Sequence, residues 1–169
     1  MEESFFNYMS IPKRHFSWKD VETACLYLKS QIEEANFKPD YIVGLTRGGL
    51  IPAVILSHLT GIKLIPLDAS FRDSNLSPES NCWLPEEVHF NDKKVFIVDD
   101  INDSGKTFNW IKGDWASSLT FEELGFDNIK FATLVHNKGS CEPTDFSFLT
   151  INKLEKDEWI VYPWESEND

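Results

Sequence analysis

The chain has 169 residues, of which 41% are hydrophobic and 14% aromatic, and this apolar content excludes a disordered protein because it can offset the entropy of folding. A net charge of −12 disfavours nonspecific binding to nucleic acid or anionic lipid, and no apolar run approaches the ~20 residues that a membrane helix needs. The three cysteines and four histidines lack the spacings of a disulfide framework or a zinc site.

No linker, repeat or low-complexity tract interrupts the chain, so we expect one domain over residues 1–169. The N-terminus is acidic and lacks the basic segment of a signal peptide, which predicts a cytoplasmic protein.

The N-terminal half predicts a helix followed by a strand–helix–strand unit. Ser17 and Asp20 form a capping-box variant, and apolar residues follow at helical spacing as far as Ala35. A buried strand over 41–45, a turn over 46–49, a helix over 50–60 ended by Gly61 and a strand over 62–67 come next. The short connections indicate a parallel strand pair with a right-handed crossover.

The C-terminal half continues this alternation after a long polar stretch. Residues 68–94 show little periodicity and predict a lid or a loose hairpin. We expect a buried strand over 95–98 that ends in two aspartates, followed by a helix from near Thr107. A short helix capped at 120–123 and ended by Gly125 comes next, and then a strand over 129–135. The segment 159–164 is expected to form an edge strand or a packed extended segment. The fold class is therefore α/β, with a central, mainly parallel sheet flanked by helices.

The loop after the strand at 95–98 carries the strongest functional signal. Ligands of open parallel sheets bind at the carboxyl ends of the strands, where this loop and the turn at 46–49 both lie. Its small residues before a helix can direct backbone N–H groups at a phosphate, and Asp99 and Asp100 can bind sugar hydroxyls or a divalent cation. A Walker A loop is excluded because Asp100 stands where that motif needs Gly, and an EF-hand is excluded because its twelfth position is Ile111.

Residues 95–107 resemble the signature with which type I phosphoribosyltransferases bind phosphoribosyl pyrophosphate (PRPP): an apolar strand, two acids, two variable positions, Asp, Thr or Ser, Gly, any residue and Thr. The resemblance to the xanthine-guanine and hypoxanthine branch extends to residues 17–18, 46–52 and 157–165, and covers nearly the whole chain apart from an insertion near 110–127. It implies a single phosphoribosyltransferase-like domain with a mobile catalytic loop.

The resemblance implies the following roles. Asp99 and Asp100 bind the ribose hydroxyls and Mg²⁺, and Asp103 and Arg47 are the catalytic residues, as general base and as the cation beside pyrophosphate. The PRPP-binding set is Thr46, Arg47, Gly48, Asp99, Asp100, Asp103, Ser104, Gly105, Lys106 and Thr107. The Thr46–Arg47 bond is the candidate for a non-proline cis peptide. Ser70-Phe71 matches the Ser-Tyr pair of the mobile loop, with Phe in place of Tyr.

The base site departs from the resemblance at one position. Trp159, followed by Ile160, is expected to stack on the purine. The branch carries a Lys just after the strand at 129–135 to bind the 6-oxo group, but simple alignment places Asn137 there, and Lys138 fits after a shift of one residue. Either residue can read the base.

The implied activity is Mg²⁺-dependent transfer of the 5-phosphoribosyl group from PRPP to a 6-oxopurine (hypoxanthine, guanine or xanthine), a purine-salvage reaction that yields the nucleoside 5′-monophosphate and pyrophosphate. The resemblance also implies a homo-oligomer, a dimer or tetramer. The acidic charge and the lack of a long apolar run predict no nucleic-acid or membrane partner. Two alternatives stay open: a PRPP-binding regulatory protein without turnover, and a transferase for a non-purine acceptor.

Overall fold

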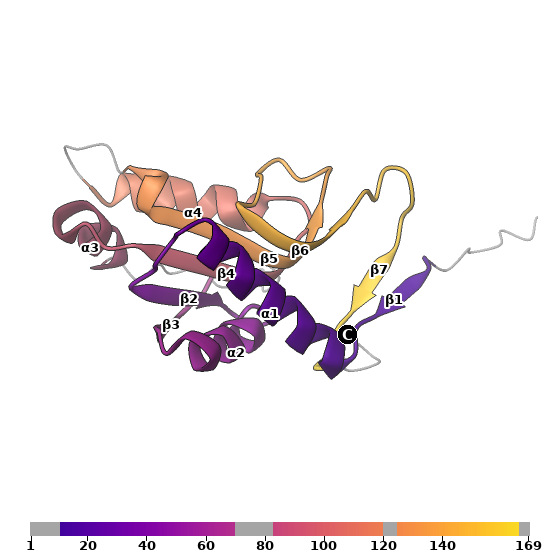
Figure 1. Cartoon of the computed structure of the whole chain (residues 1–169). Helices are drawn as coiled ribbons and strands as arrows, with labels where there is room; N and C mark the ends of the chain where they lie inside the picture. Colours follow the sequence, from indigo (N-terminus) through magenta and orange to yellow (C-terminus); the bar gives the residue numbers. More distant parts are fainter. Residues whose placement is uncertain (1–10, 70–82, 120–124, 166–169) are drawn as a thin grey trace, which may run out of the picture.

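A five-stranded sheet forms the centre of the molecule in the computed structural model, which describes residues 11–69, 83–119 and 125–165 (Figure 1). The elements in chain order are β1 (Lys13–His15), α1 (Trp18–Glu34), β2 (Tyr41–Leu45), α2 (Leu50–Thr60), β3 (Lys63–Leu67), α3 (Trp83–Asn91), β4 (Val95–Asn102), α4 (Lys106–Ser117), the 3₁₀ turn η1 (Phe126–Asn128), β5 (Ile129–Asn137), β6 (Phe146–Ile151) and β7 (Trp159–Val161).

The strands of the central sheet run in the order β3-β2-β4-β5-β6, and every neighbouring pair is parallel. Helix α2 connects β2 to β3, as the short connections predicted. The carboxyl ends of all five strands therefore lie at one edge, where the loops after β2 and β4 meet. The predicted fold class, an α/β domain with a central parallel sheet flanked by helices, is confirmed.

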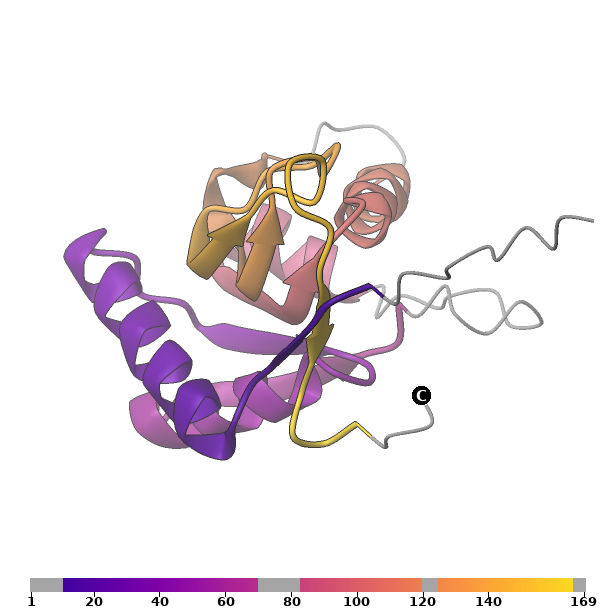
Figure 2. The same cartoon turned by 90° about the vertical axis from the view of Figure 1, so that its right-hand side faces the viewer.

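Helices cover both faces of this sheet, with α1 and α2 on one side and α4 on the other (Figure 2). Alternate residues of β4 supply the two cores. Phe96 and Val98 pack with α1 and α2, whereas Val95 and Ile97 pack with α3 and α4. A strand covered on both faces needs apolar residues on both, which explains the continuous apolar run at its start.

The first two helices form where the sequence predicted them. Ser17 caps α1, its side chain and that of Asp20 each accept a hydrogen bond from the other's backbone, and the apolar stripe from Val21 to Ile32 is buried. Helix α2 ends at Gly61, which adopts the left-handed conformation (φ 73°) and donates its N–H to the Ser57 carbonyl oxygen.

Two expectations are corrected, and two strands were missed. Residues 83–91 form helix α3 where a lid or loose hairpin was expected, because Leu84 and Val88 find an apolar surface to pack on. Strand β4 continues to Asn102, because parallel pairing with β5 extends through Asn102 and His136 and holds Asp99 and Asp100 inside the strand. Strands β1 and β6 were not predicted; β6 completes the sheet beside β5.

A separate two-stranded parallel sheet joins the two ends of the described chain. Strand β1 pairs with β7, the segment predicted as an edge strand, and the two lie side by side beyond the carboxyl end of the central sheet (Figure 1). None of the described helices is long and apolar enough to cross a membrane. The capping box at 120–123 and the loop residues Ser70 and Phe71 lie outside the described residues.

Candidate active site

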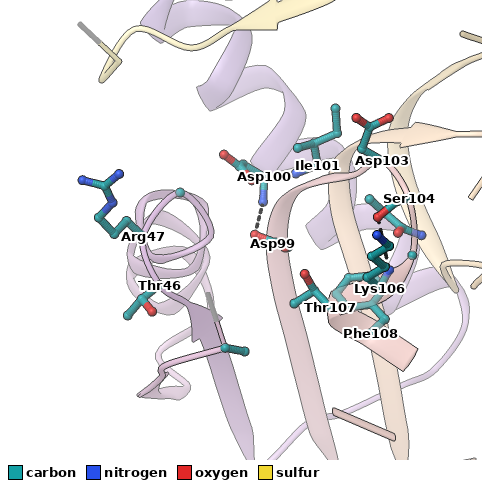
Figure 3. Close-up of a pocket in the computed structure, with 14 residues that line it drawn as sticks. Thr46, Arg47, Asp99, Asp100, Ile101, Asp103, Ser104, Lys106, Thr107 and Phe108 are labelled. Carbon is teal, nitrogen blue, oxygen red and sulfur yellow. Dashed lines mark hydrogen bonds between the residues drawn. The ribbon is translucent and has the colours of Figure 1, made fainter. Parts of the chain in front are cut away.

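Two loops that are far apart in the sequence enclose a cavity of about 300 Å³ at the carboxyl edge of the sheet (Figure 3). Thr46 and Arg47 lie on one side of it, Asp99 and Asp100 in the middle, and the start of α4 on the other. All ten residues of the predicted PRPP-binding set line this cavity: Thr46, Arg47, Gly48, Asp99, Asp100, Asp103, Ser104, Gly105, Lys106 and Thr107.

The acid pair is held rigidly by its own strand. The Asp100 N–H donates to Asp99 Oδ1 (2.9 Å) and the Ile101 N–H donates to Asp100 Oδ1 (2.8 Å), so both carboxylates have fixed directions. The Asp100 carbonyl oxygen accepts a further hydrogen bond from the buried Tyr162 hydroxyl (2.8 Å). Burial, followed by the nearby charges of Asp100 and Asp99, raises the pKa of Tyr162 well above its ordinary value, so this hydroxyl stays protonated and donates.

The loop from Asp103 to Lys106 is shaped to surround an anion. Gly105 adopts φ 84°, and a Cβ there would lie 2.6 Å from Ser140 Oγ and 2.8 Å from Cys141 Sγ, so only glycine fits. Helix α4 begins at the next residue. The N–H groups of a first helical turn have no partner within the helix, and they carry the positive end of the helix dipole. The arrangement suits a phosphate group.

The turn after β2 forms the opposite wall. The Thr46–Arg47 peptide bond is cis, as expected from the sequence. Thr46 donates its hydroxyl hydrogen to Asp68 Oδ1 (2.7 Å), which fixes the turn to the end of β3, and Arg47 is exposed at the cavity. A Cβ on Gly48 would lie 2.0 Å from Asp100 Oδ2, so the missing side chain lets the turn approach the acid pair.

A turn after β5 packs against the loop from Asp103 to Gly105 and holds it in place. Asn102, 4% exposed, donates to the Glu142 carbonyl oxygen (2.6 Å), and the Cys141 N–H donates to the Ser104 carbonyl oxygen (3.1 Å). An ion pair between Lys112 and Glu142 (2.6 Å) ties the same turn to α4. The loop from Asp103 to Gly105 is thus fixed by contacts with residues about 40 positions later.

Asp103 lies where this cavity meets the residues predicted to bind the base. Its Oδ1 accepts a hydrogen bond from Asn137 Nδ2 (3.1 Å) and its Oδ2 accepts one from Lys153 Nζ (2.8 Å). Lys153 Nζ also lies 5.6 Å from the ring centroid of Trp159, whose side chain is 44% exposed. The structure thus brings Asp103, Asn137 and Trp159 together.

Two other predicted base-site residues lie differently. Lys138 is exposed, and its backbone N–H donates to the Ile151 carbonyl oxygen (2.9 Å). Ile160 is 5% exposed and packs in the core, so it can meet a ligand chiefly through its backbone.

Lys153 and Tyr162 were not singled out from the sequence. A signal for Lys153 existed, because it comes two residues after an apolar run, 146–151, that forms a strand ending at the same edge. No local signal marked Tyr162, whose partner is 62 residues away.

The acid pair suits a magnesium ion that is shared with a substrate. Within 11–69, 83–119 and 125–165, no group of three or more His, Cys, Asp or Glu residues could hold a metal by protein ligands alone. Mg²⁺ characteristically binds through one or two carboxylates together with waters and substrate phosphates. Asp99 and Asp100, beside a loop built for phosphate, fit that pattern.

The comparisons with known proteins agree with this geometry. Residues 17–168 match the family model described as the phosphoribosyl transferase domain. The chain is 31% identical to a xanthine-guanine phosphoribosyltransferase of Cereibacter sphaeroides, covering 89% of this chain and 86% of the relative, and 24% identical to xanthine phosphoribosyltransferase 1 of Saccharomyces cerevisiae, covering 92% and 91%. Among solved structures, a purine phosphoribosyltransferase from Pyrococcus horikoshii Ot3 is similar with a TM-score of 0.69 at 31% identity, covering 92% of this chain and 95% of the other.

Proposed function

The chain belongs to the phosphoribosyl transferase domain family and is a phosphoribosyltransferase, and from that premise we propose that it transfers the 5-phosphoribosyl group of PRPP to a 6-oxopurine base, releasing pyrophosphate. The observation that carries the proposal is the single cavity shared by the turn at Thr46–Gly48, the acid pair of β4 and the loop before α4. PRPP carries a pyrophosphate, a pair of ribose hydroxyls and a 5′-phosphate, one group for each of these three parts.

We assign the 5′-phosphate to the loop from Asp103 to Thr107. The first turn of α4 offers backbone N–H groups and a positive dipole end, and Gly105 leaves room for the turn at residues 140–142 to pack against the loop. The ribose hydroxyls go to Asp99 and Asp100. Pyrophosphate goes to the turn at Thr46–Gly48, where the exposed Arg47 guanidinium can bind phosphate oxygens in a bidentate manner.

In the reaction, the bond between the anomeric carbon and pyrophosphate breaks, N9 of the purine bonds to that carbon with its lone pair, and N7 gives up the proton that it carries. Arg47 stabilises the negative charge that grows on the departing pyrophosphate. Asp103 accepts the proton that N7 of the base loses, and its carboxylate already accepts a hydrogen bond from Lys153, whose ammonium lies 5.6 Å from the Trp159 ring centroid. Asp99 and Asp100 would hold Mg²⁺, which when bound would supply neutralising charge beside the pyrophosphate.

The remaining assignments follow from the sequence resemblance and are part of the proposal. Ser70 and Phe71, which lie outside the described residues, are assigned from the resemblance to the catalytic loop that would cover PRPP and exclude water, which otherwise hydrolyses it. The chain would act as one domain in the cytoplasm, in purine salvage, and as a dimer or tetramer.

The decisive experiment incubates the purified chain with PRPP and Mg²⁺ and a panel of bases, and measures pyrophosphate release and nucleotide formation. We expect hypoxanthine, guanine or xanthine to be converted, and adenine and pyrimidines to react poorly. Reactions without base control for PRPP hydrolysis. Conversion of a pyrimidine alone would show a different acceptor. PRPP binding in calorimetry without product from any base would instead indicate a regulatory protein.

A further inference from the structure

A lysine in the connection after β6 lies beside the residues proposed to bind the base. The connection from β6 to β7 can be followed in Figure 1. Lys153 lies in this connection, and its side chain is 17% exposed although lysine is normally a surface residue. Its ammonium lies 2.8 Å from Asp103 Oδ2 and 5.6 Å from the centroid of the Trp159 ring. It therefore sits between the proposed general base and the proposed stacking platform.

Asn137 holds Lys153 in this place and is fully engaged in doing so. Its Oδ1 accepts hydrogen bonds from the backbone N–H groups of Lys153 and Gly139 (both 3.2 Å). Its Nδ2 donates to Asp103, to the carbonyl oxygen and to Oδ1 (both 3.1 Å). At 8% exposure, Asn137 would have to abandon these bonds to reach a ligand, so it positions Asp103 and Lys153 instead of reading the base.

The chemistry of a 6-oxopurine fits these two side chains. The 6-oxo oxygen and N7 lie next to each other on one edge of the ring. A carboxylate that accepts a proton from the nitrogen of this edge therefore needs a hydrogen-bond donor immediately beside it for the oxygen. Lys153 Nζ is such a donor, already within hydrogen-bond distance of Asp103. Adenine has an amino group at this position, which an ammonium cannot accept from.

Stability alone gives a weak reason for the ion pair. The Asp103 side chain is 45% exposed, and pairs with one exposed partner contribute little to folding. In addition, the ammonium lies over the ring of Trp159, which is half-exposed to solvent and is not part of a core. Both features suit a group that exchanges its partner when a ligand enters.

We propose that Lys153 is the specificity-determining residue of the base site: it pairs with Asp103 in the empty enzyme and donates to the 6-oxo oxygen when a base stacks on Trp159. The inference rests on the proposed function for the identity of the substrate. It replaces Lys138 and Asn137 as the residue that reads the base.

The test compares Lys153→Met with Lys138→Met, a matched change in a lysine that is exposed on the neighbouring turn. With saturating Mg²⁺ and PRPP, Lys153→Met should lower kcat/KM for hypoxanthine by roughly 10- to 100-fold, the effect expected for one lost charge-assisted hydrogen bond. Its activity with adenine and its KM for PRPP should stay within about twofold, and Lys153→Arg should restore part of the loss. Lys138→Met should behave as the unmodified chain. An equal loss for both bases, or a loss in Lys138→Met instead, would overturn the proposal.

A second measurement separates this proposal from the proposed function. Calorimetry gives the ratio of affinities for inosine and adenosine 5′-monophosphates, which requires no turnover. We expect the unmodified chain to prefer the inosine nucleotide and Lys153→Met to lose that preference. If the chain converts no base but shows this pattern of affinities, the proposed transfer reaction is refuted and the role of Lys153 is supported. Unchanged preference in Lys153→Met would refute that role even in an active enzyme, and so would a chain that binds neither nucleotide and converts no base.

Discussion

At the scale of single residues, the site depends on two glycines whose missing side chains allow close approaches. Gly105 needs a left-handed backbone and lies against Ser140 and Cys141, and Gly48 lies against the Asp100 carboxylate. These contacts explain how the loop from Asp103 to Thr107 and the turn at Thr46–Gly48 come close enough to share one cavity.

We predict that Gly48→Ala impairs binding while leaving the fold intact. The new methyl group would start 2.0 Å from Asp100 Oδ2, and the short carboxylate side chain is the part that can move away. Overpacking of this kind costs about 1–3 kcal/mol, so the affinity for Mg²⁺-PRPP in calorimetry should fall by about tenfold or more. Gly113→Ala is the control: it lies inside α4 with open space around it, and should leave affinity unchanged and stabilise the helix by about 0.5–1 kcal/mol. Equal affinities for both variants would contradict the close approach of turn and acid pair.

For Asp103→Asn we predict a loss of turnover without a loss of PRPP binding. The single amide oxygen can keep only one of the two side-chain hydrogen bonds, from Asn137 or from Lys153, but the Asp103 carbonyl oxygen still accepts from Asn137 Nδ2 (3.1 Å), so the loop before α4 should keep its shape. An amide cannot accept the base proton, and kcat should fall by roughly 10²–10⁴-fold. Steady-state kinetics measures kcat, and calorimetry measures the affinity for PRPP. A variant with near-normal kcat would show that Asp103 is not the general base.

At the scale of elements, the first helix shows how a local motif produces a measurable pH dependence. Asp20 Oδ2 accepts hydrogen bonds from the Ser17 hydroxyl (2.6 Å) and from the Ser17 backbone N–H (2.8 Å). These two bonds, the side-chain bond first, lower the pKa of Asp20 from its ordinary 3.8. A group with a lowered folded-state pKa stabilises the protein above its unfolded pKa, and the contribution is lost as the pH falls through the folded value.

We therefore predict that Asp20→Ala lowers the Tm at pH 7 and that the difference from the unmodified chain shrinks as the pH falls below 3.8. Thermal unfolding followed by circular dichroism between about pH 3 and pH 7 measures this difference. Glu22→Ala serves as the control, because its exposed ion pair with Lys19 is expected to contribute little. A Tm difference that is independent of pH would show that the capping box does not act through the charge of Asp20.

At the scale of the whole molecule, the C-terminal segment is hydrogen-bonded to the strand that carries the acid pair. The Tyr162 hydroxyl donates to the Asp100 carbonyl oxygen, and its ring stacks on Trp164 at 4.7 Å. Trp164 contacts Trp18 at the start of α1 (5.9 Å). The acid pair, the end of the chain and the first helix are thus linked by one aromatic cluster.

Tyr162→Phe should weaken this link without creating a cavity. Leaving the buried Asp100 carbonyl oxygen without its donor should lower the free energy of unfolding by about 1–3 kcal/mol. The raised pKa of Tyr162 means that its contribution is complete below the ordinary value of 10.0 and is lost as the pH rises above it. Denaturant unfolding at about pH 8 and pH 11 should therefore show a smaller alkaline loss of stability in Tyr162→Phe. Tyr27→Phe, a change at a residue that is 47% exposed, is the control. An identical alkaline loss in both variants would contradict the buried hydrogen bond.

The sequence by itself determined the fold class and indicated the residues of the candidate site. Ser17, Gly61 and the apolar runs at 41–45 and 95–98 are local signals, because caps and strand periodicity depend on neighbours within one turn or one strand. The spacing from Asp99 to Thr107 likewise acts within a single loop, and all the residues assigned to PRPP line one cavity.

Tertiary structure decided what depends on partners distant in the chain. Helix α3 forms because Leu84 and Val88 meet an apolar face, and β4 continues past its acids because β5 pairs with it. The cation beside Asp103 comes from the connection after β6, 50 residues further along the chain, and the hydroxyl beside Asp100 comes from Tyr162, 62 residues further along. Such contacts leave no local pattern, because the packing of the sheet, and not the spacing of the residues, brings the strand ends together.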